Sequence, residues 1–232
     1  MSSFINYDFD LRNEHFWLFV PDGYTGQEPW GLIVFINGDW VMNKLPEGWD
    51  KVLAANKLLF IAPQSADNGK PNNRREGLGT VAALEMIKNY KIDRDRVYIA
   101  GFSGGARMAS QLGFHQSDVF RATIQSCGSN YPKEVPRVAV VDADFKGHPE
   151  KYGLMQVGGG DETAARKKVK FVLATGPGDF RNHFIHDIYN GGFKHDGYQA
   201  LLLDVPGTGH QPCRADTLQK ALDFIEHGTS AP

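Results

Sequence analysis

Short apolar runs rich in β-branched and aromatic residues alternate with helical patterns along the 232 residues, and this alternation constrains the fold most. Most of the runs are continuous, which is typical of parallel strands covered on both faces. Their alternation with helices predicts βαβ units and a doubly wound sheet. The expected strands are His15–Val20, Leu32–Ile36, Leu58–Ala62, Val97–Gly101, Ala122–Ser126, Val169–Ala174 and Tyr198–Asp204.

Helices are expected between these strands where apolar residues recur three and four positions apart. The first two strands have no helical pattern between them, which predicts an antiparallel β-hairpin at one edge of the sheet. The helical stripes consist of Trp49, Val52 and Leu53; Leu78, Val81, Leu84 and Ile87; and Leu218, Ala221, Leu222 and Ile225.

The segment 130–168 interrupts this alternation with three Xaa-Pro pairs and three consecutive glycines at 158–160. A long loop inside a compact domain is usually functional or disordered, so we expect either a lid-like insertion near the site or a surface excursion. A short strand at Val138–Val141 would bring the mostly parallel sheet to about eight strands. We find neither internal repeats nor linkers, which predicts a single domain over residues 1–232.

Composition limits the partners. The formal net charge of −2 gives no electrostatic reason to expect nucleic acid. The apolar runs fall well short of the roughly 18 residues of a membrane span. The N-terminal residues show no export signal, which predicts a cytoplasmic protein if this N-terminus is native and a secreted one if a signal was removed. Oligomeric state is not predicted.

Cys127 and Cys213 are the two cysteines, and both follow or lie near the ends of expected strands. Two free buried thiols are the default expectation, and a disulfide that ties down the 207–213 loop is the alternative. His183 and His186 have no further ligand nearby in sequence, so we do not expect a structural metal. Arg74 and Arg75 suit either a solvated pair or contact with an acidic group of a substrate.

The segment 101–105 reads Gly-Phe-Ser-Gly-Gly and lies between an expected strand and an expected helix. In this context Gly-x-Ser-x-Gly predicts a sharp turn that exposes a nucleophile, here Ser103. Gly101 and Gly105 would avoid clashes between the crossing segments. A glycine-rich helix N-cap is the structural alternative.

A serine nucleophile needs a base and an acid that orients the base. His210 follows the last expected strand through a Pro-Gly-Thr-Gly turn, and Asp179 similarly follows the strand before it. Catalytic groups in such sheets gather at the carboxyl ends of the strands. Asp187, on an expected solvent-facing helix at 181–189, and Asp204, at a strand end, are the alternative acids.

The oxyanion that forms during acyl transfer needs backbone donors. The N–H of Gly104, directly after the nucleophile, is the first expected donor. The second should come from the loop after Leu32–Ile36, from either Asp39 or Trp40. Trp40 could also form a wall of an acyl pocket or pack on the rim of the core.

Three blocks of the sequence resemble a known family. Residues 19–24 (Phe-Val-Pro-Asp-Gly-Tyr) with 30–38, residues 90–109 around the Ser103 turn, and 207–210 (Gly-Thr-Gly-His) are similar to motifs of the polyhydroxybutyrate depolymerase and feruloyl esterase group of the α/β-hydrolase superfamily. The likeness covers residues 15–128 well and 169–226 loosely. It departs at Asn37, where the family has histidine, and over 130–168, for which we identify no counterpart.

The resemblance implies the α/β-hydrolase fold and hydrolysis of a small-molecule or polymer-linked carboxylic ester without a cofactor. Two alternatives stay open: a serine peptidase of the prolyl-oligopeptidase type, and a non-catalytic binding protein with the same fold. The particular ester cannot be inferred from fold analogy.

Overall fold

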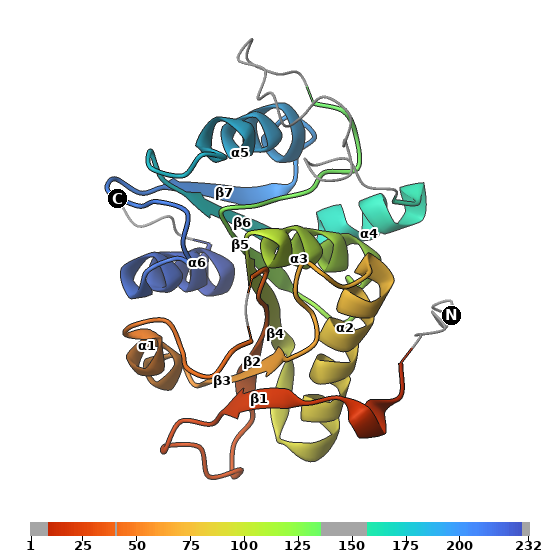
Figure 1. Ribbon diagram of the computed structural model, residues 1–232, viewed down its shortest axis with the longest axis vertical. Coiled ribbons are helices and arrows are strands. Elements are labelled where there is room, and N and C mark those ends of the chain that lie inside the picture. Colours follow the sequence, from red (N-terminus) through yellow and green to blue (C-terminus); the bar gives the residue numbers. More distant parts are fainter. Residues whose placement is uncertain (1–8, 40, 136–156, 229–232) are drawn as a thin grey trace.

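The computed structural model describes residues 9–39, 41–135 and 157–228 (Figure 1). These residues form one seven-stranded sheet in the order β1-β3-β2-β4-β5-β6-β7, in which every neighbouring pair is parallel except β1 with β3. The strands are β1 (Phe16–Phe19), β2 (Trp30–Ile36), β3 (Leu58–Pro63), β4 (Ile92–Phe102), β5 (Ala122–Ser126), β6 (Lys170–Thr175) and β7 (Gln199–Asp204).

The doubly wound, mostly parallel sheet predicted from the sequence is confirmed, and each of the seven expected runs forms a strand. The possible eighth strand, Val138–Val141, lies outside the described residues. The predicted hairpin of the first two strands is wrong: β1 pairs with β3, in the register Phe16 opposite Pro63. β2 lies inside the sheet and all its residues are buried, because helices cover both faces there, whereas the partly exposed β1 lies at the edge.

Helices cover both faces of the sheet (Figure 1). On one face, α1 and α6 pack on the strands, and on the other α2 and α3 do so, with α4 and α5 contributing to a third cluster beside α3. The helices are α1 (Trp49–Ala55), α2 (Asn72–Asn89), α3 (Gly104–His115), α4 (Gly159–Lys168), α5 (Asn182–Ile188) and α6 (Ala215–His227), with a short 3-10 helix η1 (Leu11–Asn13) and a π-helical turn η4 (Tyr189–Lys194).

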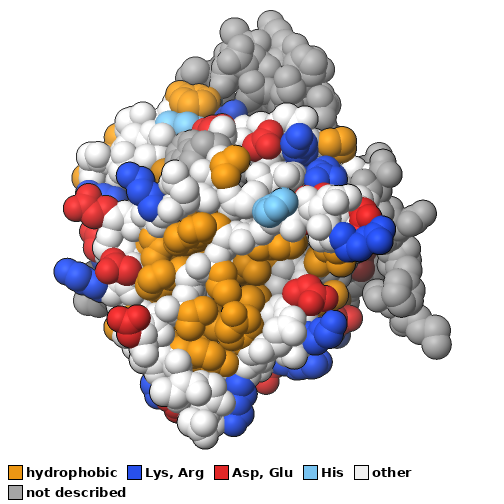
Figure 2. All heavy atoms as spheres, turned by 60° about the horizontal axis from the view of Figure 1, so that its bottom comes forward, with side chains coloured by type: hydrophobic (Ala, Val, Ile, Leu, Met, Phe, Trp, Pro, Cys, Tyr) orange, Lys and Arg blue, Asp and Glu red, His pale blue; other side chains and the backbone are white. Residues whose placement is uncertain are grey.

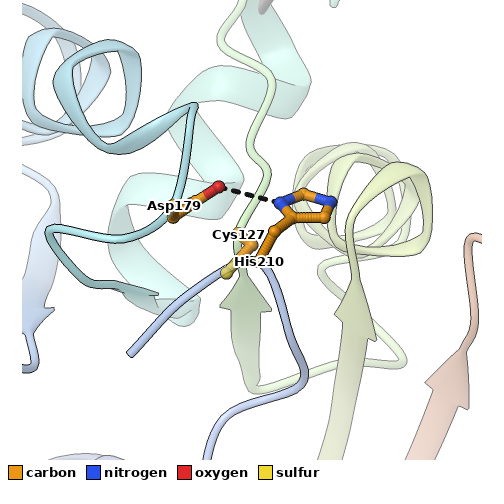
Figure 3. Close-up of side chains that lie close together, drawn as sticks. All are labelled: Cys127, Asp179 and His210. Carbon is orange, nitrogen blue, oxygen red and sulfur yellow. Dashed lines mark hydrogen bonds and ion pairs between the residues drawn. The ribbon is translucent and has the colours of Figure 1, made fainter. Parts of the chain in front are cut away.

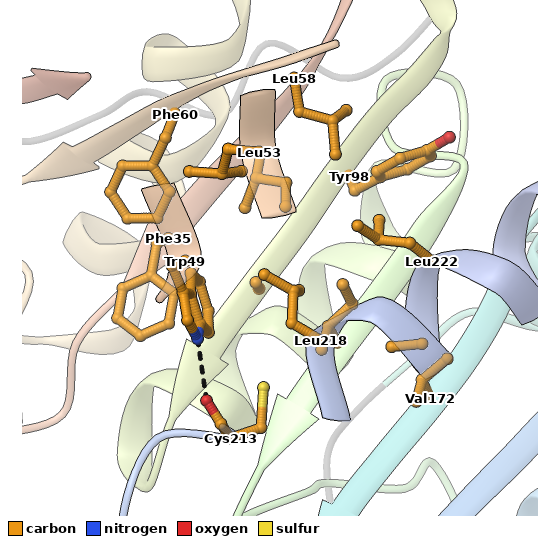
Figure 4. Close-up of a cluster of buried hydrophobic side chains, with 14 of the residues drawn as sticks. Phe35, Trp49, Leu53, Leu58, Phe60, Tyr98, Val172, Cys213, Leu218 and Leu222 are labelled. Atoms are coloured by element: carbon orange, nitrogen blue, oxygen red, sulfur yellow. Dashed lines mark hydrogen bonds between the residues drawn. The ribbon is translucent and has the colours of Figure 1, made fainter. Parts of the chain in front are cut away.

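The core side chains alternate between the two faces, as strand geometry requires. Ile33 and Phe35 of β2 point into the cluster under α1 and α6, while Leu32 and Val34 point into the one under α2 and α3. Figure 4 shows the first cluster, where the indole N–H of Trp49 donates to the carbonyl of Cys213 at 2.9 Å. This bond joins α1 to the loop that precedes α6.

Two helical expectations need correction. In α2, Leu84 is 48% exposed instead of belonging to the buried stripe. Each step of three residues falls 60° short of a full helical turn, so the predicted stripe turns away from the buried face along the helix. The buried face contains Leu78, Ala82 and Met86 instead. The glycines at 158–160 do not extend a loop, because Gly158 caps α4 and the other two form its first turn.

One face of the molecule carries a band of hydrophobic side chains surrounded by charged ones (Figure 2). Figure 2 turns the lower part of Figure 1, where the edge strand β1 lies, toward the reader. Within the described residues, no helix is both long and apolar enough to cross a bilayer.

Asp196, just after η4, accepts hydrogen bonds from the hydroxyl of Tyr131 at 2.7 Å and the ammonium of Lys133 at 2.9 Å. Burial alone would raise the pKa of Asp196, but the bonds from Tyr131, Lys133 and His195 outweigh it and lower the pKa overall. A carboxyl whose pKa is lower in the folded state stabilises the fold above its unfolded pKa, and this contribution is lost as the pH falls toward the folded value.

Asp196→Asn should therefore lower the free energy of unfolding at neutral pH by about 2 kcal/mol. The difference from the parent should shrink below about pH 4, where the unfolded carboxyl takes up its proton. Urea unfolding at several pH values measures both effects. Asp95→Asn is the control, because Asp95 is 86% exposed in its pair with Arg121 and should change stability by less than about 0.5 kcal/mol. A pH-independent difference for Asp196→Asn would contradict the prediction.

Candidate active site

Ser103 lies on the tight turn between β4 and α3. Its backbone has φ 56° and ψ −119°, a left-handed conformation that strains a residue with a side chain by about 1–3 kcal/mol. The turn is possible because a Cβ on Gly101 would collide with the backbone of Gly105, and one on Gly105 with the carbonyl of Ile36. The N–H of Ser103 donates to the carbonyl of Ser126 at 2.9 Å, which ties the turn to β5.

His210 lies on the loop that follows β7, where Gly207 supplies a positive φ of 74°. The imidazole Nε2 is 3.0 Å from the hydroxyl oxygen of Ser103. The loop is joined to the segment after β6 by a parallel bridge between Gly178 and Gly209, and the N–H of Gly178 donates to the carbonyl of Thr208 at 3.0 Å. The two segments that carry the histidine and the aspartate are thus held side by side.

Asp179 follows β6 and faces the other nitrogen of the imidazole: its Oδ1 is 2.8 Å from Nδ1 of His210 (Figure 3). Its Oδ2 accepts from the hydroxyl of Thr175 at 2.8 Å, and the N–H of Arg181 donates to Oδ1 at 3.1 Å. Burial would raise the pKa of Asp179, but these hydrogen bonds, led by that from His210, lower it overall. The carboxylate is therefore held ionised and aligned with the imidazole.

The two alternative acids are Asp204 and Asp187. Asp204, at the end of β7, bonds through its carboxylate to Nε2 of His186 at 2.8 Å and to the amide of Asn182 at 3.2 Å. Asp187 is in α5 as expected, but the prediction that it faces solvent is wrong, because it is only 7% exposed. The face of α5 that carries Asp187 therefore packs against the protein interior.

The expected oxyanion donors lie in two adjoining segments. The N–H of Gly104 is at the N-terminus of α3, where the first N–H groups of a helix have no intrahelical partner. Gly38 packs directly on the turn: a Cβ at Gly38 would lie 2.9 Å from the nitrogen of Gly104. The next residue, Asp39, is exposed, and Trp40 lies outside the described residues. The loop after β2 therefore lies against the turn that carries Ser103, and the assignment of the second donor to Asp39 or Trp40 stays a prediction.

Asn37, which replaces the histidine of the resembled family, is buried before this loop. Its amide nitrogen donates to the sulfur of Met42 at 3.6 Å, and its Oδ1 is buried without a hydrogen-bond partner among the described residues. Asn37 thus anchors the start of the loop to the segment that follows it.

Residues not predicted from the sequence also surround His210. The ring centroid of Phe180, which is 59% exposed, lies 4.4 Å from that of the imidazole. The ring centroid of the buried Phe102 lies 4.9 Å from it. Aromatic residues this close are not signalled by any motif, because their proximity depends on the meeting of three strand ends. The exposed ring of Phe180 therefore adds apolar surface directly beside His210.

Cys127 lies under the histidine loop at the tip of β5 (Figure 3). Its thiol donates to the carbonyls of Gly209 and Gln211, at 3.5 and 3.3 Å, on either side of His210. Burial, with the nearby charge of Asp179, raises the pKa of this thiol, which keeps it protonated.

Cys127 and Cys213 are both free and buried, so the default expectation holds and the disulfide alternative is wrong. Within the described residues, one group could offer three metal ligands: Cys127, Asp179 and His210, whose donor atoms lie within 4.8 Å of one another. A metal there would have to displace both the Nδ1 proton of His210 and the thiol proton of Cys127.

A cavity of about 660 Å³ lies beside this site, between the segment that follows the loop of Gly38 and the one that follows His210. Its apolar wall includes Met42, whose sulfur bonds to Asn37, and Cys213, whose N–H donates to the hydroxyl of Ser126 at 3.2 Å. Ser126 is also the residue that bonds to Ser103. The other lining residues are Asn43, Lys44, Leu45, Pro46, Glu47, Gly48, Gln211, Pro212, Arg214, Ala215 and Asp216.

No protein-family model and no curated protein sequence matches the chain. Solved structures do match. The S-formylglutathione hydrolase of Staphylococcus aureus superposes with a TM-score of 0.64 at 13% identity, covering 91% of this chain and 92% of that chain. A ferulic acid esterase from the anaerobic fungus Anaeromyces mucronatus has a TM-score of 0.57 at 16% identity, with 85% and 84% covered.

A thermophilic esterase from Thermogutta terrifontis has a TM-score of 0.58 at 14% identity, with 92% of this chain and 86% of that chain covered. These proteins match over most of both chains, so the similarity extends to the fold of the whole chain. At such identities the comparison speaks for architecture and leaves the substrate open. The chain therefore has the α/β-hydrolase fold.

Proposed function

We propose that the protein is a serine carboxylic-ester hydrolase that acts through an acyl-enzyme, with Ser103, His210 and Asp179 as its triad. The observation that carries the proposal is the unbroken hydrogen-bonded series from the hydroxyl of Ser103 through both imidazole nitrogens to the carboxylate of Asp179. A buried, strained serine whose hydroxyl faces an oriented imidazole is the arrangement that nucleophilic catalysis requires.

In the first half of the reaction, Nε2 of His210 takes the proton of Ser103 as the hydroxyl oxygen attacks the ester carbonyl. The imidazolium that forms is stabilised by Asp179, which stays ionised. His210 then gives the proton to the departing alcohol oxygen, leaving an acyl group on Ser103. In the second half, water repeats these steps and releases the carboxylic acid.

The negative charge of each tetrahedral intermediate would be held by the N–H of Gly104 and by a second N–H from Asp39 or Trp40. Donors already aimed at the developing charge need no reorganisation during the reaction, which is why such sites commonly supply the largest part of the rate enhancement. The contact between Gly38 and Gly104 supports this role, because it places the two donor segments against each other.

The proposal is tested by labelling with a fluorophosphonate, which reacts only with an activated serine. Mass spectrometry of the labelled protein should locate the adduct on Ser103, and Ser103→Ala should not be labelled. A panel of p-nitrophenyl, feruloyl, acetyl-sugar and peptide substrates then separates an esterase from a peptidase. Absence of labelling would favour the non-catalytic binding protein, and faster cleavage of peptides than of esters would favour the peptidase.

We further propose that the cavity beside the triad receives an uncharged, apolar part of the ester. The surface that lines it is mostly apolar although several polar residues contribute to it, and their charges balance, with Arg214 already paired to Asp216 at 2.6 Å. A volume of this size is in the range of pockets for small organic ligands.

Leu45→Ser should lower kcat/KM for p-nitrophenyl octanoate about tenfold while leaving p-nitrophenyl acetate within about twofold, because only the longer chain loses apolar contact. A series with fixed acetyl and varied alcohol groups shows whether the cavity holds the acyl or the alcohol part. Leu84→Ser is the matched control, since Leu84 lines a separate cavity with Arg94 and Asp118, at the amino ends of the strands. Equal losses for acetate and octanoate would contradict this use of the cavity.

A further inference from the structure

Arg75 is a buried cation to which the proposed mechanism gives no role. It lies in the first turn of α2 and is only 4% exposed. Its Nε donates to the carbonyl of Ala66 at 2.9 Å and its Nη2 to Oδ1 of Asn68 at 3.3 Å. Burial lowers the pKa of Arg75 to about 10, against the opposing effect of nearby carboxylates. At neutral pH the side chain is therefore still charged, and a buried charge requires a compensating environment.

The residue that Arg75 contacts, Asn68, is bound to the proposed oxyanion loop in two ways. Its backbone N–H donates to the carbonyl of Gly38 at 2.8 Å, and its Nδ2 donates to the carboxylate of Asp39 at 3.0 Å. Because Oδ1 faces a cation and Nδ2 faces a carboxylate, a flipped amide would oppose both neighbours. The amide of Asn68 is therefore held in one orientation.

The same amide packs against the other donor segment. A Cβ added to Gly104 would collide with the side chain of Asn68, so the amide lies directly over the residue that follows the nucleophile. Asn68 thus contacts the loop of Gly38 and Asp39 on one side and the start of α3 on the other, and Arg75 holds it from behind.

We propose that Asn68 and Arg75 are positioning residues that fix the geometry of the oxyanion site, and that the charge of Arg75 offsets that of Asp39 there. This inference rests on the proposed function. Asp39 carries a carboxylate beside a site where a second negative charge develops, and two like charges repel each other. The hydrogen bond from Asn68 fixes the position of the Asp39 carboxylate. The positive charge of Arg75, which contacts the same amide, opposes the electrostatic field of that carboxylate.

Arg74 offers a matched control, because the adjacent arginine points elsewhere. Its guanidinium bonds to Glu14 and lies 5.5 Å from the ring centroid of Phe9, away from the Ser103 turn. Arg74 and Arg75 were expected to be a solvated pair or to meet an acidic substrate group, and neither expectation holds for the buried Arg75. Arg74→Met and Arg75→Met remove the same charge one residue apart.

The test uses a trifluoromethyl ketone labelled with ¹³C at its carbonyl, which forms a hemiketal with Ser103 that mimics the tetrahedral intermediate. The ¹³C shift followed against pH gives the pKa of the hemiketal hydroxyl. Asn68→Ala and Arg75→Met should each raise that pKa by about 1 and lower kcat for p-nitrophenyl acetate about tenfold, with KM little changed. Arg75→Lys should recover part of both losses, and Arg74→Met should change neither.

A lower melting temperature with an unchanged hemiketal pKa in Asn68→Ala would overturn the inference and reduce both residues to a structural role. If Arg75→Met does not fold, Asn68→Ala and Arg75→Lys still decide the question. Fluorophosphonate labelling of the parent distinguishes failure of the proposed function from failure of this inference alone. A parent that is not labelled on Ser103 would overturn both. A labelled parent with unaltered variants overturns only the inference.

Discussion

Ser103→Ala is expected to lower kcat for ester hydrolysis on the order of 10⁴-fold or more, because it removes the covalent route through the acyl-enzyme. The fold should be retained, since alanine differs only by a hydroxyl whose described contact is with His210. Steady-state kinetics with p-nitrophenyl acetate measure the loss, and the thermal melting temperature, within a few degrees of the parent, reports the fold. Activity within tenfold of the parent would contradict the nucleophile assignment.

His210→Ala should be about as damaging as Ser103→Ala, and the double variant hardly worse than either. The reason is that the serine and the histidine act as a unit, so that removing one leaves the other without a role. Losses that multiply in the double variant would show that His210 serves some other function.

Asp179→Asn should lower kcat on the order of 10³- to 10⁴-fold with KM little changed. An amide at this position can donate to Nδ1, which favours the tautomer that places the proton on Nε2, where it cannot accept the serine proton. Kinetics with saturating and limiting p-nitrophenyl acetate separate the two parameters.

Asp204→Asn is the control for this variant, because Asp204 also follows a strand and also bonds to a histidine, but to His186 instead of His210. It should lower kcat less than about threefold, as expected for a group outside the reacting centre. The reverse ranking would move the acid to Asp204. Equal, mild effects would mean that the imidazole is oriented without a carboxylate and that the triad is a dyad.

The sequence alone determined the architecture and the principal candidate residues of this protein. Continuous apolar runs alternating with amphipathic stripes have few solutions other than a covered parallel sheet, and the carboxyl ends of its strands must then share one edge. For this reason Ser103, His210 and Asp179 could be placed near one another from their positions just after strands. The role of the glycines around Ser103 could be predicted as well, because a Gly-x-Ser-x-Gly turn between a strand and a helix requires small residues on both sides of the nucleophile.

The tertiary structure decided the features that depend on contacts between segments distant in sequence, namely strand order, burial and long-range contacts. The strand order was not recoverable for β1, since the same half-apolar strand could have paired with β2 or with β3. The burial of Arg75 and Asp187 was missed because a charged residue in a helix is exposed unless a distant part of the chain covers it. The contact of Asn68 with Gly104 joins residues from different strand ends, and such long-range contacts leave no periodicity in the sequence.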